Sequence, residues 1–163
     1  MKHTISILVE NHAGVLARVA GLFARRGFNI DSLAVGVTED EKISRITIIA
    51  DGTAYTLEQI EKQLNKLIDV IKVRHLPAEE LLSRELVLIK VACQPSQRAE
   101  LISLAEIAKA KISDITVNTM TLELSDSVPR IKTLEELLRP YGIKETVRTG
   151  SIAMQKGGAS MKL

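Results

Sequence analysis

Apolar and polar residues alternate through the first ten positions of the chain, and the spacing of the apolar residues then changes. The alternation at Ile5, Ile7 and Val9 predicts a half-buried β-strand. The residues that follow have the 3.6-residue spacing of an amphipathic helix. The apolar face of this predicted helix is formed by Val15, Val19, Leu22 and Phe23, and Leu16 lies beside it. Gly27 ends the helix, since glycine adopts the left-handed cap conformation at little cost.

The same analysis extends along the first half of the chain and predicts six elements in the order strand, helix, strand, strand, helix, strand. Their ranges are His3–Val9, Val15–Arg26, Asn29–Val37, Ile43–Ala50, Thr56–Leu67 and Val70–His75. Thr56 and Gln59 have the spacing of a capping box at the start of the second helix. The apolar face of that helix is predicted to comprise Ile60, Leu64, Leu67 and Ile68.

A second set of six elements follows in the same order. Pro77 interrupts the fourth strand and marks a linker over residues 76–80. The predicted elements after it are Glu85–Cys93, Gln97–Ala110, Lys111–Asn118, Thr119–Leu124, Ser127–Arg139 and Ile143–Thr149. We therefore predict two domains, residues 1–77 and 78–163, with a mobile tail from about residue 151.

This order of elements indicates the fold class α+β, with two ferredoxin-like βαββαβ units. Each unit would have a four-stranded antiparallel sheet with two helices on one face. The other face of each sheet is then uncovered or meets a partner. Pairing of two sheets through an edge strand would produce a dimer.

A short turn joins the first predicted strand to the first predicted helix. Asn11 and Gly14 bracket this turn. The first N–H groups of a helix have no intrahelical partner and carry partial positive charge, so they can hold a small carboxylate without a basic side chain. The alternative is that Asn11 only caps the helix and that Gly14 only eases the turn.

Composition restricts the range of functions. The chain of 163 residues has a net charge of +2 and contains two Phe, two Tyr and no Trp, which argues against nucleic-acid binding. Cys93 is the only cysteine and lies in an apolar run, so we expect it to be buried and to bind no metal. The N-terminus lacks a secretory signal and no apolar run is long enough for a bilayer, so we expect a cytoplasmic protein without membrane association.

Catalytic motifs are absent from the sequence. It contains no nucleophile elbow, zinc-protease motif, Walker A motif or dinucleotide fingerprint. His12 lies in the turn and is predicted to face solvent, although it could contact a bound carboxylate. His3 and His75 fall on neighbouring strands, but without a third ligand they make a weak metal site. Three carboxylates at residues 39–41 are interpreted as a solvated hairpin tip.

The turn and first helix also carry a long motif, N-x-x-G-x-L-x-R-V-x-G-L-F-x-R-R-G-F-N-I-x-S-L, over residues 11–33. The run closely resembles the start of the regulatory small subunit of acetohydroxyacid synthase, also called acetolactate synthase. The likeness continues at residues 44–48 and 57–70, and it is looser in the second half. A general ACT-type ligand-binding domain would share only the glycine-bearing turn and scattered apolar positions.

This resemblance implies a non-catalytic subunit that binds a separate catalytic subunit, activates it and confers feedback inhibition by a branched-chain amino acid, most often valine. The ACT domains of two copies would pair with the amino acid between them. The chain would need no cofactor of its own, whereas the catalytic partner would carry thiamine diphosphate, magnesium and FAD. The residues implied or expected to bind the effector are Asn11, Ala13, Gly14, Val15, Leu16, Asn29 and Ile30.

Each of these residues has an expected role. Backbone N–H groups of Ala13 to Leu16 would hold the effector carboxylate, and oxygens of Asn11 or Asn29 would accept from its ammonium group. Val15, Leu16 and Ile30 would line a small apolar pocket. The resemblance places Asn29 at the position that reaches the effector across the dimer. Preference among valine, leucine and isoleucine stays open because family members vary at His12-Ala13.

Two alternatives come from other functional classes. A stand-alone amino-acid-responsive regulator of transcription, or of another biosynthetic enzyme, would share the ACT domain, but the chain lacks a helix-turn-helix segment and a basic face. A small enzyme with a ferredoxin-like fold would need a convergent set of catalytic residues, which the sequence does not show.

Overall fold

The computed structural model describes residues 1–162. These residues form two compact units, the first made of residues 1–82 with residues 151–162 and the second of residues 83–150. Within the described residues, no helix combines the length and apolar character needed to cross a membrane.

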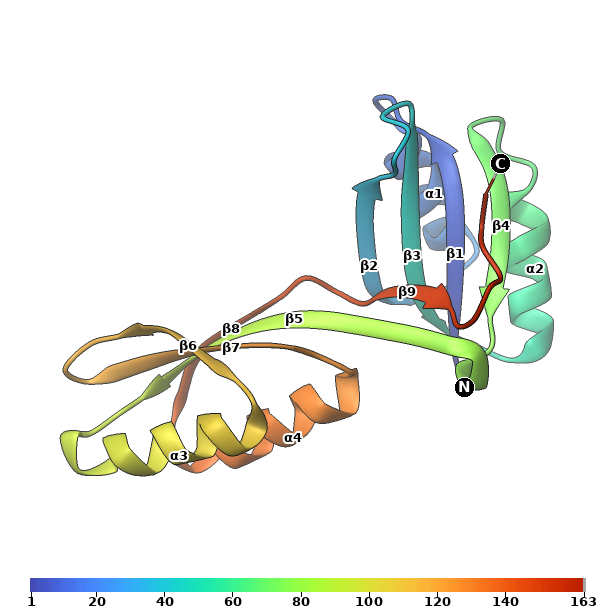
Figure 1. Cartoon of the computed structure of the whole chain (residues 1–163). Coiled ribbons are helices and arrows are strands. Elements are labelled where there is room, and N and C mark those ends of the chain that lie inside the picture. The colour runs from blue at the N-terminus through green and yellow to red at the C-terminus, as the bar shows by residue number, and fades with distance from the viewer. Residues whose placement is uncertain (163) are drawn as a thin grey trace. The chain divides into compact units, whose positions relative to one another are not determined.

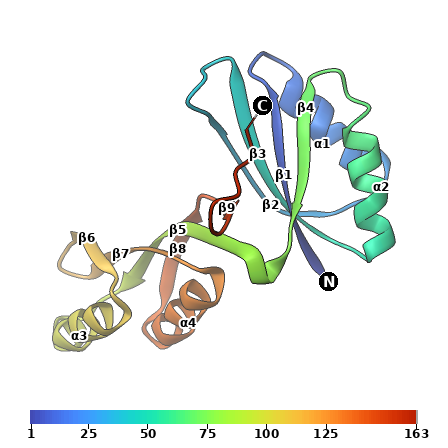
Figure 2. The same ribbon diagram turned by 45° about the vertical axis from the view of Figure 1, so that its right-hand side comes forward.

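The first unit has the predicted order of elements. These are β1 (Lys2–Glu10), α1 (Val15–Arg25), β2 (Ile30–Val37), β3 (Ile43–Asp51), α2 (Ala54–Leu64) and β4 (Val70–Leu76). The strands form one antiparallel sheet in the order β2-β3-β1-β4. Both helices lie on the same face of this sheet (Figures 1 and 2). The predicted βαββαβ unit is therefore confirmed.

The core of the first unit lies between the sheet and its two helices. Ile5 pairs with Ile48 and Ile7 pairs with Ile46, so the two central strands direct alternate side chains to the helices. The buried members of this core are Ile5, Ile7, Val9, Val15, Val19, Leu22, Phe23, Ile46, Ile48, Ala50, Ile60 and Leu64. The predicted apolar face of the first helix is confirmed, and Leu16, beside that face, is 42% exposed.

Helix α2 differs from the prediction at both ends. Its cap is Thr53, whose Oγ1 accepts a hydrogen bond from the Thr56 backbone N–H at 3.2 Å, so the predicted cap at Thr56 is wrong. The helix ends at Leu64, where the side chain of Asn65 donates to the Glu61 carbonyl at 2.9 Å. Ile68 therefore lies beyond the helix and is 91% exposed, which corrects its predicted place on the apolar face.

The second face of this sheet is crossed by the C-terminal segment of the chain. Strand β9 (Ile152–Gln155) lies there (Figure 1). Arg45 donates from Nε to the Ser6 hydroxyl at 2.8 Å and from Nη2 to the Ala153 carbonyl at 2.8 Å. Arg74 Nη1 donates to the Ser160 carbonyl at 3.2 Å. These bonds explain why Ser6 is fully buried on the face that has no helix.

The structure thus groups residues 151–162 with the first unit, whereas the sequence analysis placed them at the end of the second domain. The cations on β3 and β4 hold this segment largely through its backbone carbonyls, with one further bond from Arg74 Nη1 to Gln155 Oε1 at 3.3 Å. Backbone acceptors leave no pattern in the amino-acid sequence. The mobility expected for the segment stays a prediction that protease sensitivity can test.

Replacing Arg45 with glutamine is expected to speed tryptic cleavage after Lys156. The substitution removes the charge-assisted bond to the Ala153 carbonyl, and loss of one such bond should raise the open population about tenfold. Cleavage would be followed by mass spectrometry. Arg26→Gln, at the exposed end of α1, is the matched control and should leave the rate unchanged. Equal rates for both variants would show that Arg45 does not hold the segment.

The second unit repeats the architecture. Its elements are β5 (Leu81–Ala92), α3 (Arg98–Ala108), β6 (Lys111–Ile115), β7 (Thr119–Asp126), α4 (Val128–Leu138) and β8 (Ile143–Arg148), with sheet order β6-β7-β5-β8. Three short 3-10 helices are η1 (Ala78–Glu80), η2 (Pro95–Gln97) and η3 (Arg139–Tyr141). Strand β5 begins at Leu81, earlier than predicted, directly after η1 in the expected linker. Cys93 is fully buried in the core of this unit, as predicted.

Candidate functional site

The turn between β1 and α1 presents an open helix N-terminus. Gly14 occupies the cap position with φ +89°, in the left-handed region where a side chain costs about 1–2 kcal/mol. Within residues 1–162, no side chain caps this helix and no acidic residue lies in its first turn. The first intrahelical bond runs from the Arg18 N–H to the Gly14 carbonyl at 3.1 Å. The N–H groups of residues 15–17 therefore point out of the helix end, where an anion can accept from them.

Asn11 fixes the other side of this turn. Its backbone N–H donates to the Lys42 carbonyl at 2.7 Å, and its side-chain Nδ2 donates to the Glu41 carbonyl at 2.7 Å. Both acceptors belong to the tip of the β2–β3 hairpin. The amide is thereby oriented with its oxygen as the group available to a ligand ammonium.

The predicted site residues in the turn are not equally accessible. Asn11, Ala13 and Gly14 are exposed. Val15 is 3% exposed and packs in the core, so it can offer a ligand its backbone N–H but not its side chain. Leu16 is 42% exposed and is the apolar side chain that the turn presents to solvent.

Asn29 and Ile30 lie at the opposite end of the sheet from the turn. Ile30 pairs with Ala50, and Ala50 pairs with His3, whereas the turn follows Glu10. Seven residues of strand separate the two levels, which corresponds to about 23 Å. Asn29 itself is exposed, and its Nδ2 donates to the Asp31 carboxylate at 2.8 Å. One chain therefore does not bring the two halves of the predicted site together.

Charged side chains form a cluster next to the β1–α1 turn. The sequence analysis did not predict this cluster. Asp69, in the α2–β4 turn, is 5% exposed. Its Oδ1 lies 3.0 Å from His12 Nε2, and its Oδ2 accepts from Arg18 Nη1. His12 Nε2 also lies 3.3 Å from Glu10 Oε2, and its Nδ1 lies 3.1 Å from the Ala13 carbonyl. We call these four side chains, Glu10, His12, Arg18 and Asp69, the turn cluster.

The turn cluster changes the acid–base behaviour of its histidine. The hydrogen bond to the Ala13 carbonyl raises the pKa of His12 above its ordinary value, and the charge of Asp69 and hydrogen bonds to Asp69 and Glu10 add to this rise. His12 is exposed, as predicted for a solvent-facing turn residue, but its ring also contacts Asp69, Glu10 and the Ala13 carbonyl.

One member of the turn cluster, Arg18, could have been predicted from the sequence. Arg18 follows Gly14 by four residues, and helical side chains lean towards the helix N-terminus, so an arginine at this position reaches back to the turn. Asp69 is 51 residues from Arg18, and no local sequence pattern marks Asp69 as the shared partner of His12 and Arg18.

Glu10, His12 and Asp69 are also the one group of three metal-type ligands that the described residues bring within 4.8 Å of one another. Because Arg18 binds Asp69 and both His12 nitrogens face acceptors, hydrogen bonds already account for this arrangement, and we interpret it as an ion-pair cluster. The rings of His3 and His75 lie 5.4 Å apart, and no third metal-type ligand joins them among the described residues.

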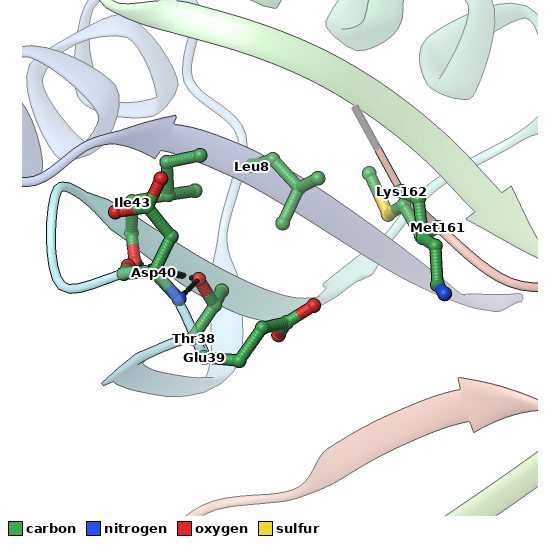
Figure 3. Close-up of a pocket in the computed structure, with 7 residues that line it drawn as sticks. All are labelled: Leu8, Thr38, Glu39, Asp40, Ile43, Met161 and Lys162. Atoms are coloured by element: carbon green, nitrogen blue, oxygen red, sulfur yellow. Dashed lines mark hydrogen bonds between the residues drawn. The ribbon is translucent and has the colours of Figure 1, made fainter.

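A shallow hollow of about 230 Å³ lies on the other side of the sheet (Figure 3). Its walls are Leu8, Thr38, Glu39, Asp40, Ile43, Met161 and Lys162. Asp40 Oδ1 accepts from the Lys42 N–H at 2.9 Å, and Thr38 Oγ1 donates to the Asp40 carbonyl at 3.0 Å. These bonds close the hairpin, so the Asp40 carboxylate has a structural role, and none of the predicted site residues lines the hollow.

Comparison with known families matches both units. Residues 5–72 match the model described as the AHAS small subunit-like ACT domain, and residues 84–157 match the model described as the small subunit of acetolactate synthase.

Individual proteins match over almost the whole chain. A probable acetolactate synthase small subunit of Archaeoglobus fulgidus is 49% identical over 96% of this chain and 98% of its own length. The acetolactate synthase small subunit of Mycobacterium leprae is 45% identical over 95% of this chain and 92% of its own. The crystal structure of the acetolactate synthase small subunit from Thermotoga maritima superposes with a TM-score of 0.91 at 38% identity, covering 98% of this chain and 99% of that one.

Proposed function

Because this chain belongs to the family of acetolactate synthase small subunits, we propose that it is the regulatory chain that binds and activates a separate catalytic subunit and confers inhibition by a branched-chain amino acid, valine above all. Catalysis would reside on the partner, which would carry thiamine diphosphate, magnesium and FAD. The observation that carries this proposal is the open N-terminus of α1 beside an oriented Asn11 amide.

We call the exposed turn at Asn11–Gly14 and the outward N–H groups of residues 15–17 the cradle. The cradle suits a free amino acid. A carboxylate would accept hydrogen bonds from the outward N–H groups at the helix end, where the dipole also favours negative charge. The Asn11 oxygen would accept from the ammonium group. Leu16, which is 42% exposed, would contact a short aliphatic side chain.

A second copy of the chain would complete the site. Strand β2 is an edge strand, and its residues Val35 and Val37 are 46% and 64% exposed. Antiparallel pairing of β2 with β2 of a second copy would cover these valines and satisfy the open edge. That pairing sets the start of one β2 beside the end of the other. Val37 pairs with Ser44, and Ser44 pairs with Val9, so the end of β2 lies level with the turn. Asn29 of one copy would then approach Gly14 of the other.

Inhibition would follow if the effector stabilises one arrangement of the paired ACT domains within the larger assembly. The coupling needed is about 1–3 kcal/mol, the usual scale of allosteric linkage. The chain's contribution is then the binding site and the coupling, without a chemical step of its own.

Calorimetric titration of the full chain with valine, leucine and isoleucine tests the proposal. We expect all three to bind, with free energies that differ by about 1–3 kcal/mol, because one methylene in an apolar pocket discriminates weakly. D-valine is the control, since its ammonium and side chain cannot both reach their partners once the carboxylate is bound. The absence of binding by all three L-amino acids would refute the effector site.

A further inference from the structure

Both ring nitrogens of His12 face hydrogen-bond acceptors. Nδ1 lies 3.1 Å from the Ala13 carbonyl, and Nε2 lies 3.0 Å from Asp69 Oδ1 and 3.3 Å from Glu10 Oε2. A neutral imidazole carries one N–H and can donate to only one of these sides. The imidazolium carries two and satisfies both, so the contacts favour the protonated form of the ring.

Arg18 brings a second cation to the same turn. A methyl group built on Gly14 would lie 4.0 Å from Arg18 Nη2, which places the guanidinium beside the cradle. Asp69 holds Arg18 through Oδ2 and His12 through Oδ1. One buried carboxylate therefore positions two cationic groups at the turn to which the effector carboxylate is assigned.

We propose that the turn cluster makes effector binding proton-linked, with Asp69 as a positioning residue that holds Arg18 and protonated His12 beside the effector carboxylate. This inference rests on the proposed function, since it assigns the regulation of the same site. Protonated His12 also fastens the turn through the Ala13 carbonyl, directly before the N–H groups that would receive the carboxylate.

The charged groups around His12 are known from each neighbouring element. Strand β1 contributes Glu10, helix α1 contributes Arg18, and the α2–β4 turn contributes Asp69. The β2–β3 hairpin carries Glu41 and Lys42, whose backbone carbonyls are bound to Asn11. Two carboxylates thus contact His12 directly, the guanidinium contacts one of them, Asp69, and the carboxylates favour the charged ring.

The sign of the pH dependence follows from these contacts. The pKa of His12 is raised in the free chain, and an effector carboxylate beside it would raise the pKa further. Binding of valine then takes up protons, and by reciprocity the affinity falls as the pH rises through the His12 pKa. We expect the affinity to fall about three- to tenfold between about pH 6 and about pH 9.

Calorimetry of the full chain with L-valine, in buffers of different ionisation enthalpy, measures the protons taken up. At a pH slightly above the ordinary pKa of histidine, we expect the unmodified chain to take up a fraction of a proton when valine binds. We expect His12→Gln to take up none. The side chain of His12 is 46% exposed, so the substitution should not disturb folding. Uptake that is unchanged in His12→Gln, or absent from a chain that binds valine, would overturn the inference.

Arg18→Gln tests the permanent charge of the guanidinium separately from the charge of His12, which depends on pH. We expect it to weaken valine binding about tenfold, the scale of one charge-assisted hydrogen bond, while proton uptake by His12 persists. Arg18→Lys should restore part of the affinity because it keeps the charge. If Arg18→Gln binds valine as the unmodified chain does, the guanidinium has no part in the site.

The two proposals fail differently. If valine does not bind to the unmodified chain at any pH, the effector site itself is refuted. If valine binds with no proton uptake and no change in either variant, the effector site stands and only the role of the turn cluster is refuted.

Discussion

Replacing Asn29 with alanine is expected to abolish inhibition by valine while leaving activation of the catalytic subunit intact. Asn29 is exposed, and its side chain donates one hydrogen bond, to the Asp31 carboxylate, so its removal should not disturb the fold. Asn29 lies about 23 Å from the turn of its own chain. Its expected role is therefore to bind an effector held at the turn of a second copy. The measurement is acetolactate formation by the reconstituted catalytic and regulatory subunits, with and without valine.

The matched control is Asn65→Ala, which removes an exposed amide from the same unit. Asn65 donates to the Glu61 carbonyl at the end of α2 and lies outside the proposed site. This variant should keep both activation and inhibition. If Asn29→Ala stays as sensitive to valine as Asn65→Ala, the effector does not lie between paired ACT domains.

The position of Asn29 also explains why the two halves of the site could not be placed from one chain. The motif over residues 11–33 contains both halves, but the register of the sheet separates them. An edge strand with exposed valines indicates how a second copy would bring them together. The oligomer is therefore part of the site, and the monomer presents only the cradle.

Periodicity was sufficient to predict the architecture, because each strand and helix buries one face. Ile5 and Ile7 alternate with polar residues and lie in the core, and Phe23 follows the helical spacing and is 1% exposed. Where local capping competes with periodicity, the prediction was wrong. Ile68 continues the spacing of α2, but Asn65 ends the helix before it.

Contacts between distant residues could not be predicted in the same way. Asp69 meets His12 and Arg18 because the α2–β4 turn and the β1–α1 turn lie at the same end of the sheet, where Glu10 N–H donates to the Asp69 carbonyl at 2.9 Å. Arg45 and Arg74 hold the C-terminal segment largely through backbone carbonyls, which every residue possesses. In both cases the specificity comes from the tertiary arrangement rather than from a local pattern.

Replacing Ile7 with alanine is expected to destabilise the first unit by about 2–5 kcal/mol. Ile7 is fully buried on β1, and it pairs with Ile46 in the centre of the sheet. The substitution removes three carbons from a packed core and leaves a cavity that two rigid layers cannot close. Because the chain contains no tryptophan, native-state hydrogen exchange of the β1 and β3 amides is the suitable measurement, and it reports on this unit separately.

Ile68→Ala is the same substitution at a site that is 91% exposed. It should change the free energy of opening by less than about 0.5 kcal/mol. Comparing Ile7→Ala with Ile68→Ala therefore shows whether Ile68 is exposed or belongs to the apolar face of α2. If it belonged to that face, Ile68→Ala would lower the free energy of opening as much as Ile7→Ala does. A large loss of protection in Ile68→Ala would place that side chain in the core and would contradict the end of α2 at Leu64. Similar protection in Ile7→Ala and the unmodified chain would contradict the packing of the sheet against its two helices.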